Sequence, residues 1–322
     1  MKRLLRIAGW ILLALVVVVG GAVMWAFVTA QSRYTHAWVI HDASFPIPFP
    51  LSAAARAALP EGTSDAAADS IALTRAVASG DRLLHTRLPC GDCHGRDLGG
   101  GVVIDQPVVA YWAAPNLTTG QGSVTLGFTA HDWDRAVRHG VRRNGKSSSM
   151  PSLEFANLSD HELSDVIAYV RSRPPVDRTM KPVRFGAVFS FVVATDPRSL
   201  PAFLVDHQAA HAVEPPPAAD AVALGRHIAQ TCQGCHGPNF SGGKMAGDPS
   251  MPIVANLTPD TSGVAGWTEA DFLRALHEGK RPDGSSLLDA MPWRVYGKMS
   301  DVELKAVWAY LRTLPPTPRG KR

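Results

Sequence analysis

Cysteine is scarce in this chain, with only four residues among 322. The four form two C-x-x-C pairs, Cys90/Cys93 and Cys232/Cys235. No cysteine remains for a structural disulfide or an isolated thiol, so a disulfide framework is excluded. We therefore expect each pair to have a local chemical role.

An excess of one charge is also lacking outside the extreme N-terminus. The formal net charge is +4, and Lys2, Arg3 and Arg6 supply three of these charges, which leaves 29 basic against 28 acidic residues. No stripe of Lys and Arg interleaves with aromatic residues, which make up only 7% of the chain. We therefore expect no nucleic-acid partner.

One long hydrophobic run follows the basic N-terminus. Ile7 to Ala30 contains 24 residues without a charge, and about 20 apolar residues span a bilayer as a helix. We expect residues 1–30 to anchor the chain in a bacterial inner membrane, with everything after Ala30 in the periplasm. The alternative is a cleavable signal peptide, because residues 28–30 resemble a cleavage site. Both interpretations export the rest of the chain.

Two stretches of the chain repeat each other. The sequence CGDCH at 90–94 matches CQGCH at 232–236, an offset of 142 residues, and further motifs follow in the same order at offsets of 139 to 143. These further pairs begin at Gly99 and Gly242, Ala114 and Val254, Gly127 and Gly266, Met150 and Met291, Leu158 and Met299, Ala168 and Ala309, and Pro174 and Pro315. Because order and register persist, we interpret the chain as one domain fold written twice.

This repeat defines the domain organisation that we expect. The first domain covers 68–175 and the second 218–316. A linker at 31–67 follows the anchor, a connection at 176–217 joins the domains, and 317–322 forms a tail. The connection holds the apolar stretch Phe185–Ala194, which is too short to span a membrane. We expect it to pack against a domain; membrane contact or a partner surface are the alternatives.

Each copy has the pattern of three helices. The first helix is expected at about 69–84 and 220–229, directly before the cysteine pair. The middle and last helices have matching start and stop signals. These are Thr129 and Thr268 as N-caps with Gly140 and Gly279 as stops, and Ser159 and Ser300 as N-caps with Glu162 and Glu303 completing capping boxes. No sustained strand alternation occurs in either copy, so the expected fold class is all-α.

The motif C-x-x-C-H is the attachment signature of haem c. Two thiols three positions apart lie on one helical turn and reach the two vinyl groups of one porphyrin, and the next residue, His, points at the iron. The expected thioether cysteines and proximal ligands are Cys90, Cys93 and His94 for one haem, and Cys232, Cys235 and His236 for the other. A redox dithiol does not require the His, and a four-cysteine zinc site would join pairs from separate repeats.

The sixth iron ligand is expected from a methionine. Met150 lies 56 residues after His94 and Met291 lies 55 after His236, and each precedes a proline in a loop before the last helix. A loop Met is otherwise poorly explained, because Met normally fills cores. Loop packing, with His or water on the iron, is the alternative. The rival methionines without a counterpart in the other copy are Met180, Met245, Met251 and Met299.

Other polar residues carry weaker expectations. Asn116 and Asn256 bond either a haem propionate or a neighbouring backbone group. Tyr169, Trp308 and Tyr310 are expected in the core between helices. The remaining histidines are expected to be mostly exposed; they are His36, His41, His85, His131, His139, His161, His207, His211, His227 and His277.

With these motifs the sequence resembles class I c-type cytochromes, and more narrowly the multihaem cytochrome c subunits of membrane-bound alcohol and gluconate dehydrogenases. The resemblance covers roughly residues 70–175 and 218–316. It implies a tandem pair of cytochrome c-like helical haem domains and a periplasmic electron-transfer role. The chain departs from those subunits in having two haems rather than three and an N-terminal anchor.

Two haems with His/Met ligation leave no open iron position for a substrate, and Met ligation raises the reduction potential. The leading hypothesis is therefore a membrane-tethered carrier rather than an enzyme. It would pass electrons from a dehydrogenase or quinol-oxidising complex to an oxidase or soluble cytochrome. One alternative is a dihaem peroxidase or thiosulfate-type oxidoreductase, which needs a differently ligated haem. Another is an electron-transfer subunit fixed within a larger dehydrogenase or oxidase complex.

Overall fold

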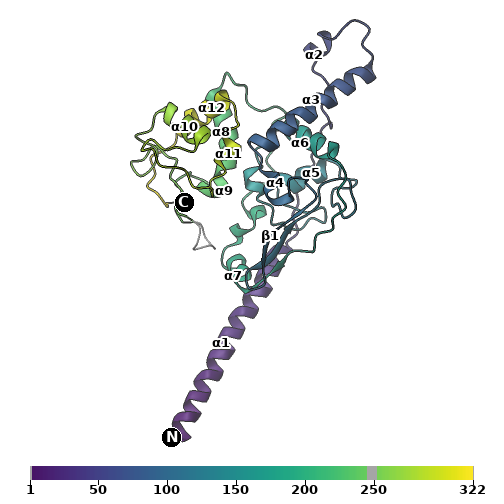
Figure 1. Cartoon of the computed structure of the whole chain (residues 1–322). Helices are drawn as coiled ribbons and strands as arrows, with labels where there is room; N and C mark the ends of the chain where they lie inside the picture. The colour runs from purple at the N-terminus through teal and green to yellow at the C-terminus, as the bar shows by residue number, and fades with distance from the viewer. Residues whose placement is uncertain (1, 245–251, 322) are drawn as a thin grey trace.

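The computed structural model describes residues 2–244 and 252–321. Its most extended feature is helix α1 (Lys2–Tyr34), which projects away from the rest of the molecule (Figure 1). Only Ala26 and Ala30 of this helix are buried. The helix is long and apolar enough to cross a membrane. The hydrophobic run of the sequence therefore forms one continuous, almost fully exposed helix.

The first repeat forms unit 1, drawn in blue and teal in Figure 1. Its main helices are α3 (Asp65–Thr86), α4 (Cys90–His94), α5 (Ala130–Val137) and α6 (Asp160–Ser172), with the short α2 (Ala53–Ala57) before them and a 3₁₀ turn, η1 (Ser152–Glu154), before α6. Helix α3 packs on α6. At their crossing, a Cβ on Gly80 would overlap the Asp165 carbonyl, so only glycine allows this approach.

The second repeat forms unit 2, in green and yellow, with the same arrangement. Its elements are α8 (Ala221–Ala229), η4 (Gln230–Cys232), α9 (Gln233–His236), α10 (Glu269–Glu278), α11 (Trp293–Tyr296) and α12 (Asp301–Leu311). Helix α8 packs on α12, and a Cβ on Gly225 would overlap the Ala306 carbonyl. Gly225 therefore plays in unit 2 the part that Gly80 plays in unit 1. Tyr169, Trp308 and Tyr310 are buried core residues, as predicted.

The predicted starts of the middle and last helices are confirmed, whereas α3 begins at Asp65, four residues before its predicted start. Thr129, Thr268, Ser159 and Ser300 are all N-caps, and each takes part in a complete capping box. The third residue of the box is Glu162 or Glu303 in the last helices, as predicted; in the middle helices it is Asp132 or Asp271. Each box satisfies backbone N–H groups that have no partner within the helix.

The all-α prediction is wrong for unit 1, which contains a small antiparallel sheet in the order β1-β2-β3. Strand β1 (Gly101–Gln106) pairs with β2 (Ala110–Ala114), and β2 pairs with β3 (Arg184–Phe185). The burial of β1 does not alternate, and its Val102 and Val103 are exposed. The register is also irregular between Val102 and Ile104. Such a strand lacks the period of two on which the prediction depended.

The connection between the units ties α1 to unit 1. Helix α7 (Ala187–Thr195) packs against α1 and β2, and the 3₁₀ turns η2 (Pro197–Ser199) and η3 (Pro201–Phe203) follow it. Ala30, Val193 and Leu200 form a small buried cluster. Arg33 Nη1 donates to the Ala194 carbonyl at 2.8 Å. The apolar stretch of the connection thus lies against both the long helix and the sheet of unit 1.

The segment that precedes unit 1 is also packed rather than extended. Phe45 belongs to the core cluster of unit 1, with Phe49 against its edge. The Ser164 hydroxyl donates to the Pro46 carbonyl at 2.7 Å. Residues 45–49 of the expected linker therefore complete the core of the first unit.

The two units meet through matched ion pairs. Arg82 on α3 pairs with Glu303 of unit 2 at 2.9 Å, and His227 on α8 pairs with Glu162 of unit 1 at 2.7 Å. Arg82 and His227 each lie two residues after the glycine of a helix crossing, and both glutamates complete capping boxes. Arg87 adds a further pair to Glu162 at 2.8 Å. The interface therefore approximates a two-fold relation between the repeats.

Candidate haem-binding sites

Each predicted proximal histidine is buried and held in a defined orientation. His94 Nδ1 lies 2.8 Å from the Pro115 carbonyl, and His236 Nδ1 lies 2.8 Å from the Ala255 carbonyl. A carbonyl oxygen only accepts, so Nδ1 carries the hydrogen in both rings and Nε2 presents its lone pair. Burial lowers the pKa of His94, which favours the neutral form that ligates metal. Backbone support of this kind is the usual device that orients a metal-binding imidazole.

A cavity of about 340 Å³ lies beside the second motif. Its lining is mostly apolar, with Leu257, Phe272 and Leu276 among the contributors. The same cavity is lined by Cys232, Cys235, His236 and Met291. Two thiols, an imidazole and a thioether in an apolar cavity are the donor set that a haem c requires. These residues therefore fit the cofactor.

The first motif has corresponding surroundings. Cys90 and Met150 both pack against the core cluster of unit 1, and His94 is buried. Each candidate methionine also begins a tight turn. The Ser152 amide donates to the Met150 carbonyl at 2.8 Å, and the Trp293 amide donates to the Met291 carbonyl at 2.7 Å. The two Met-Pro loops therefore have the same local backbone arrangement.

The methionines that rivalled them lie in different places. Met299 is a buried core residue of unit 2 and also lines the cavity. The Met180 side chain lies against Gly100, near the first motif. Met245 and Met251 lie outside the described residues. Among the rival methionines that the structure describes, Met299 is the one that lines the cavity of unit 2.

The cysteine thiols lie in surroundings that disfavour thiolates. Burial raises the pKa of Cys90 and of Cys232 to about 12. A zinc ligand or a redox-active nucleophile requires the thiolate. The environment is therefore unfavourable for the redox dithiol alternative, while a thioether carries no charge to be desolvated.

The paired asparagines bond the backbone. Asn116 Nδ2 donates to the Val176 carbonyl at 2.6 Å, and Asn256 Nδ2 donates to the Thr317 carbonyl at 2.7 Å. In both units the asparagine Oδ1 also accepts from the threonine amide two residues later. The segment after each Pro-Pro pair is thereby held against the haem motif. The repeat therefore extends to 178 and 319, beyond the Pro-Pro pairs.

Glu154 of η1, a residue of unit 1 that no sequence motif indicated, lies at the second motif. It lies against Gly234, one of the two residues between the cysteines, where a Cβ would overlap the Glu154 carboxylate. The side-chain amide of Gln230 also donates, through Nε2, to the Leu153 carbonyl at 2.8 Å. Burial raises the pKa of Glu154 to about 7. The corresponding residue of unit 2 is Val295, so the repeat carries no matching acid.

The prediction that the remaining histidines are mostly exposed is wrong for several of them. His139 and His207 are buried, at 0% and 7% exposure. The side chains of His211 and His227 are each only 9% exposed. His85 stays exposed, as predicted. The buried histidines contact segments distant in sequence, and periodicity gives no information about such contacts.

Fold and site together define a protein with covalently attached haem. A family model described as "Cytochrome c" matches residues 222–315, and one described as "Cytochrome C oxidase, cbb3-type, subunit III" matches 75–170. The chain thus contains two cytochrome c domains, binds two haems c, and is an electron-transfer protein.

Several curated proteins are similar to this chain. The "Fructose dehydrogenase cytochrome subunit" of Gluconobacter japonicus is 34% identical over 32% of this chain and 24% of its own length. The "Gluconate 2-dehydrogenase cytochrome c subunit" of Pantoea cypripedii is 35% identical over 28% and 22%. The "Diheme cytochrome c-type" protein of Cereibacter sphaeroides is 24% identical over 76% and 87%. The chain thus spans only about a quarter of the length of the first two relatives.

Proposed function

We propose that this chain is a membrane-anchored, periplasmic dihaem cytochrome c that relays electrons. It would carry them from a dehydrogenase or quinol-oxidising complex to an oxidase or soluble cytochrome. The observation that carries this proposal is that the Met-Pro segment of each unit packs against the other unit. The η1 turn after Met150 packs against η4 and α9 of the second motif, and α11 after Met291 packs against α3. Two haems held on adjoining sides of the two units suit electron transfer from one haem to the other.

In this proposal the cofactors are held by two equivalent sets of residues. Cys90 and Cys93 form the thioethers of one haem, with His94 and Met150 as axial ligands. Cys232, Cys235, His236 and Met291 form the second set. When bound, each haem supplies a one-electron iron couple. The protein orients Nε2 of each histidine through the Nδ1 hydrogen bond and shields the group from water with apolar walls.

The domain boundaries follow the same proposal. The haem domains cover 68–175 and 218–316, each completed by the segment held by its asparagine. Residues 31–67 include the packed stretch at 45–49, and 176–217 include α7. The anchor covers residues 1–30.

Packing at the end of α1 supports a retained anchor rather than a cleaved signal. Ala30 is 1% exposed and lies in the cluster with Val193 and Leu200. Cleavage after Ala30 would remove one member of that cluster. In the intact mass of the membrane-extracted protein we expect residues 1–30 to be present together with two haems. A mass that lacks these residues would contradict the anchor.

A fixed place in a dehydrogenase complex is the second candidate, because relatives are named as cytochrome subunits of fructose and gluconate dehydrogenases. Mild detergent extraction of the tagged full chain, followed by native electrophoresis, distinguishes the two. A free relay migrates alone and is reduced by added donor. Stoichiometric co-migration with a dehydrogenase or oxidase supports the subunit role instead.

The ligand set has a separate spectroscopic test. Ferric haem with a methionine ligand has a weak near-infrared charge-transfer band, and two such haems give twice the intensity of one. We expect two equivalents per chain. One equivalent would mean that a haem lacks its methionine, which would weaken the relay proposal and favour an enzyme with an open iron.

A further inference from the structure

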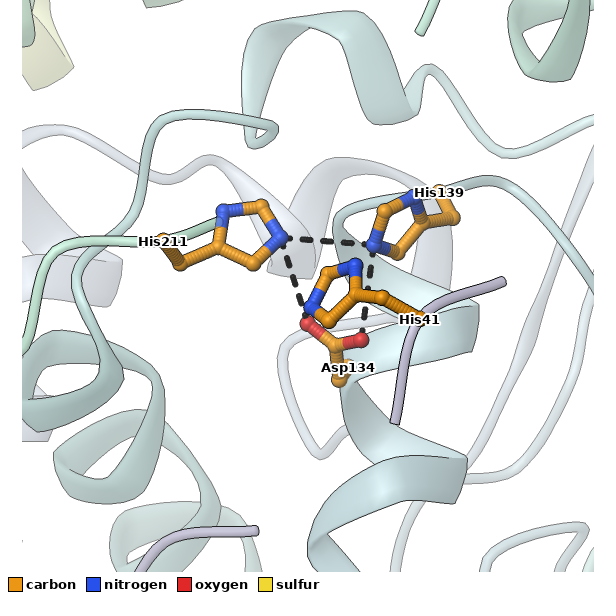
Figure 2. Close-up of side chains that lie close together, drawn as sticks. All are labelled: His41, Asp134, His139 and His211. Atoms are coloured by element: carbon orange, nitrogen blue, oxygen red, sulfur yellow. Dashed lines mark hydrogen bonds and ion pairs between the residues drawn. The ribbon is translucent and has the colours of Figure 1, made fainter. Parts of the chain in front are cut away.

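Four side chains outside the haem sites converge in unit 1. They are His41, Asp134, His139 and His211, and one ligand atom from each lies within 4.8 Å of all the others (Figure 2). Asp134 lies on α5 and His139 follows its end, whereas His41 comes from the segment after α1 and His211 from the connection between the units. Three separate parts of the chain therefore meet at one point.

The carboxylate of Asp134 is fully buried and surrounded by basic groups. The side chain is 0% exposed, and neither oxygen has a hydrogen-bond partner in the described part of the chain. The basic nitrogens around it are Arg138 Nη1 at 3.3 Å, His139 Nε2 at 3.4 Å and His211 Nε2 at 3.6 Å. Arg138 is also shared with Asp160 at 2.8 Å. Buried charges are paired or coordinate metals, and this carboxylate is held by ion pairs that are each 3.3 Å or longer.

The hydrogen bonds around the cluster orient two imidazoles as ligands. His207 Nε2 lies 2.9 Å from the Ala202 carbonyl, so it donates, and His207 Nδ1 is left as an acceptor. His139 Nδ1 therefore donates to His207 Nδ1 at 3.0 Å, which leaves the lone pair of His139 Nε2 in the cluster. His41 Nδ1 donates to the His207 carbonyl at 3.2 Å, which leaves its Nε2 to ligate. Fixing the far nitrogen in this way is typical of metal sites.

The spacing of the ligand atoms suits a tetrahedral ion. Bonds of about 2.0–2.1 Å to zinc place neighbouring ligand atoms about 3.3 Å apart. His139 Nε2 and His211 Nε2 lie 3.3 Å apart, and the two nearest contacts of these nitrogens with Asp134 are 3.4 and 3.6 Å. The contacts with Asp134 go to two different oxygens, Oδ2 for His139 and Oδ1 for His211, so the edge between the two histidines is the one already near its required length.

We propose that one divalent metal ion of the zinc type binds at a structural site with four protein ligands. These ligands are His41, Asp134, His139 and His211. Four protein ligands leave no open position, so the ion stabilises structure rather than catalysing a reaction. It joins the segment after α1 and the inter-unit connection to unit 1. The residues of unit 2 that align with Asp134 and His139 are Leu273 and Glu278. The site thus belongs to the flanking segments and not to the repeated haem fold.

The test is metal content of the haem-loaded full chain in detergent. The protein is stripped with a chelator, titrated with zinc chloride, passed through a desalting column and analysed for zinc and iron. We expect one zinc for every two irons. X-ray absorption at the zinc edge should show only nitrogen and oxygen neighbours with imidazole scattering. No retained zinc, or sulfur neighbours, would overturn the proposal.

Variants separate this site from general zinc binding. His211→Gln should weaken zinc binding at least about 100-fold, because even residues that only support ligands cost 10–100-fold. His85→Gln on α3 is the matched control, since its side chain is 58% exposed and far from the cluster in sequence, and it should bind zinc as the unmodified chain does. Equal binding by His211→Gln and the unmodified chain would refute the assignment. If His211→Gln loses its haems, Asp134→Asn replaces it under the same criterion.

Discussion

At the scale of single residues, the two haem motifs differ less than their sequences suggest. Both histidines donate Nδ1–H to a carbonyl at 2.8 Å, and both carbonyls immediately precede the Asn-Leu-Thr segment. The asparagine then holds the chain that follows the Pro-Pro pair. In each unit, the histidine, the carbonyl that accepts its hydrogen bond and the chain after the Pro-Pro pair therefore support one another. A substitution in any of these three parts should change the reduction potential of the haem iron.

The first prediction concerns Met291, the methionine proposed as the axial ligand in unit 2. Met291→Leu should remove one equivalent of the near-infrared band and lower the potential of one haem, because a thioether ligand stabilises ferrous iron. Redox titration followed by absorbance measures both effects. Met299→Leu is the control, since Met299 lines the same cavity from the core. If Met299→Leu loses the band and Met291→Leu keeps it, the assignment is reversed.

The second prediction concerns pH and Glu154. Burial raises the pKa of this carboxyl to about 7, and the groups near it are the cysteines of both motifs and the Tyr296 phenol. Thioethers do not titrate, and burial raises the pKa of Tyr296 as well, so Glu154 is the member of this group that ionises near neutral pH. Loss of its proton as pH rises through 7 places a negative charge beside the second motif.

That charge stabilises ferric iron, so the potential of the second haem should fall as pH rises. Each 1 kcal/mol of this stabilisation lowers a one-electron potential by roughly 40 mV. In Glu154→Gln the fall between pH 6 and 8, a range of about one unit on either side of the pKa, should be smaller. Potentiometric titration at several pH values checks this. An unchanged slope would assign the pH dependence to other groups, the haem propionates foremost.

The repeated residues of these sites could be predicted from the sequence, whereas the residues that occur in one unit alone could not. The cysteines, histidines and Met-Pro loops occur twice, so their pattern is visible in the chain. Glu154 and the His41 cluster occur once, and their neighbours come from other segments. Tertiary contacts of this kind leave no local period.

At the scale of elements, the helices could be predicted because their caps are written locally, as at Thr129 and Ser300. The sheet could not, because β1 lacks alternation and pairs with β2, whose other neighbour β3 lies some 70 residues further along the chain. In the sequence, helix α7 could be recognised only as an apolar stretch. What it packs against depends on α1, which is 150 residues away in the chain.

The third prediction concerns the helix crossings. Gly225→Ala places a Cβ into the Ala306 carbonyl and should force α8 and α12 apart. We expect a loss of about 2 kcal/mol or more in the free energy of unfolding, as for other overpacked cores. Gly80→Ala should do the same at the α3–α6 crossing.

Gly266→Ala provides the control, because nothing lies within 4 Å of a Cβ at that position. Urea unfolding followed by helical circular dichroism measures all three variants. A loss in Gly266→Ala as large as in Gly225→Ala would show that the effect is not one of helix contact.

At the scale of the whole molecule, the interface between the units decides whether two haem domains act as one body. Its buried part is the pair of Glu162 and His227, 8% and 9% exposed, and Glu162 is also held within unit 1 by Arg87, 6% exposed. Its more open part is the pair of Arg82, at 52% exposure, with Glu303. Both glutamates complete capping boxes, so the two differ mainly in burial.

The fourth prediction follows from that difference. Glutamine also completes a capping box, so Glu162→Gln chiefly leaves the buried Arg87 without a counter-charge and should cost about 3–5 kcal/mol. Glu303→Gln, the matched control, should cost about 1 kcal/mol or less, because Arg82 is half exposed. Comparable losses in the two variants would mean that the buried network around Glu162 adds no more stability than the exposed pair of Arg82 and Glu303.

The pH dependence of stability gives the same interface a second, independent measure. Burial alone would raise the pKa of Glu162, but the Arg87 charge and the His227 hydrogen bond hold it well below its usual range. The unfolded chain therefore binds a proton that the folded chain does not, near the ordinary glutamate value of about 4.3. The stabilisation is present above that pH and is lost as pH falls through and below it. Urea midpoints measured across this range should thus fall more steeply with acid in the unmodified chain than in Glu162→Gln. Parallel curves for the two proteins would locate the acid sensitivity in groups other than Glu162.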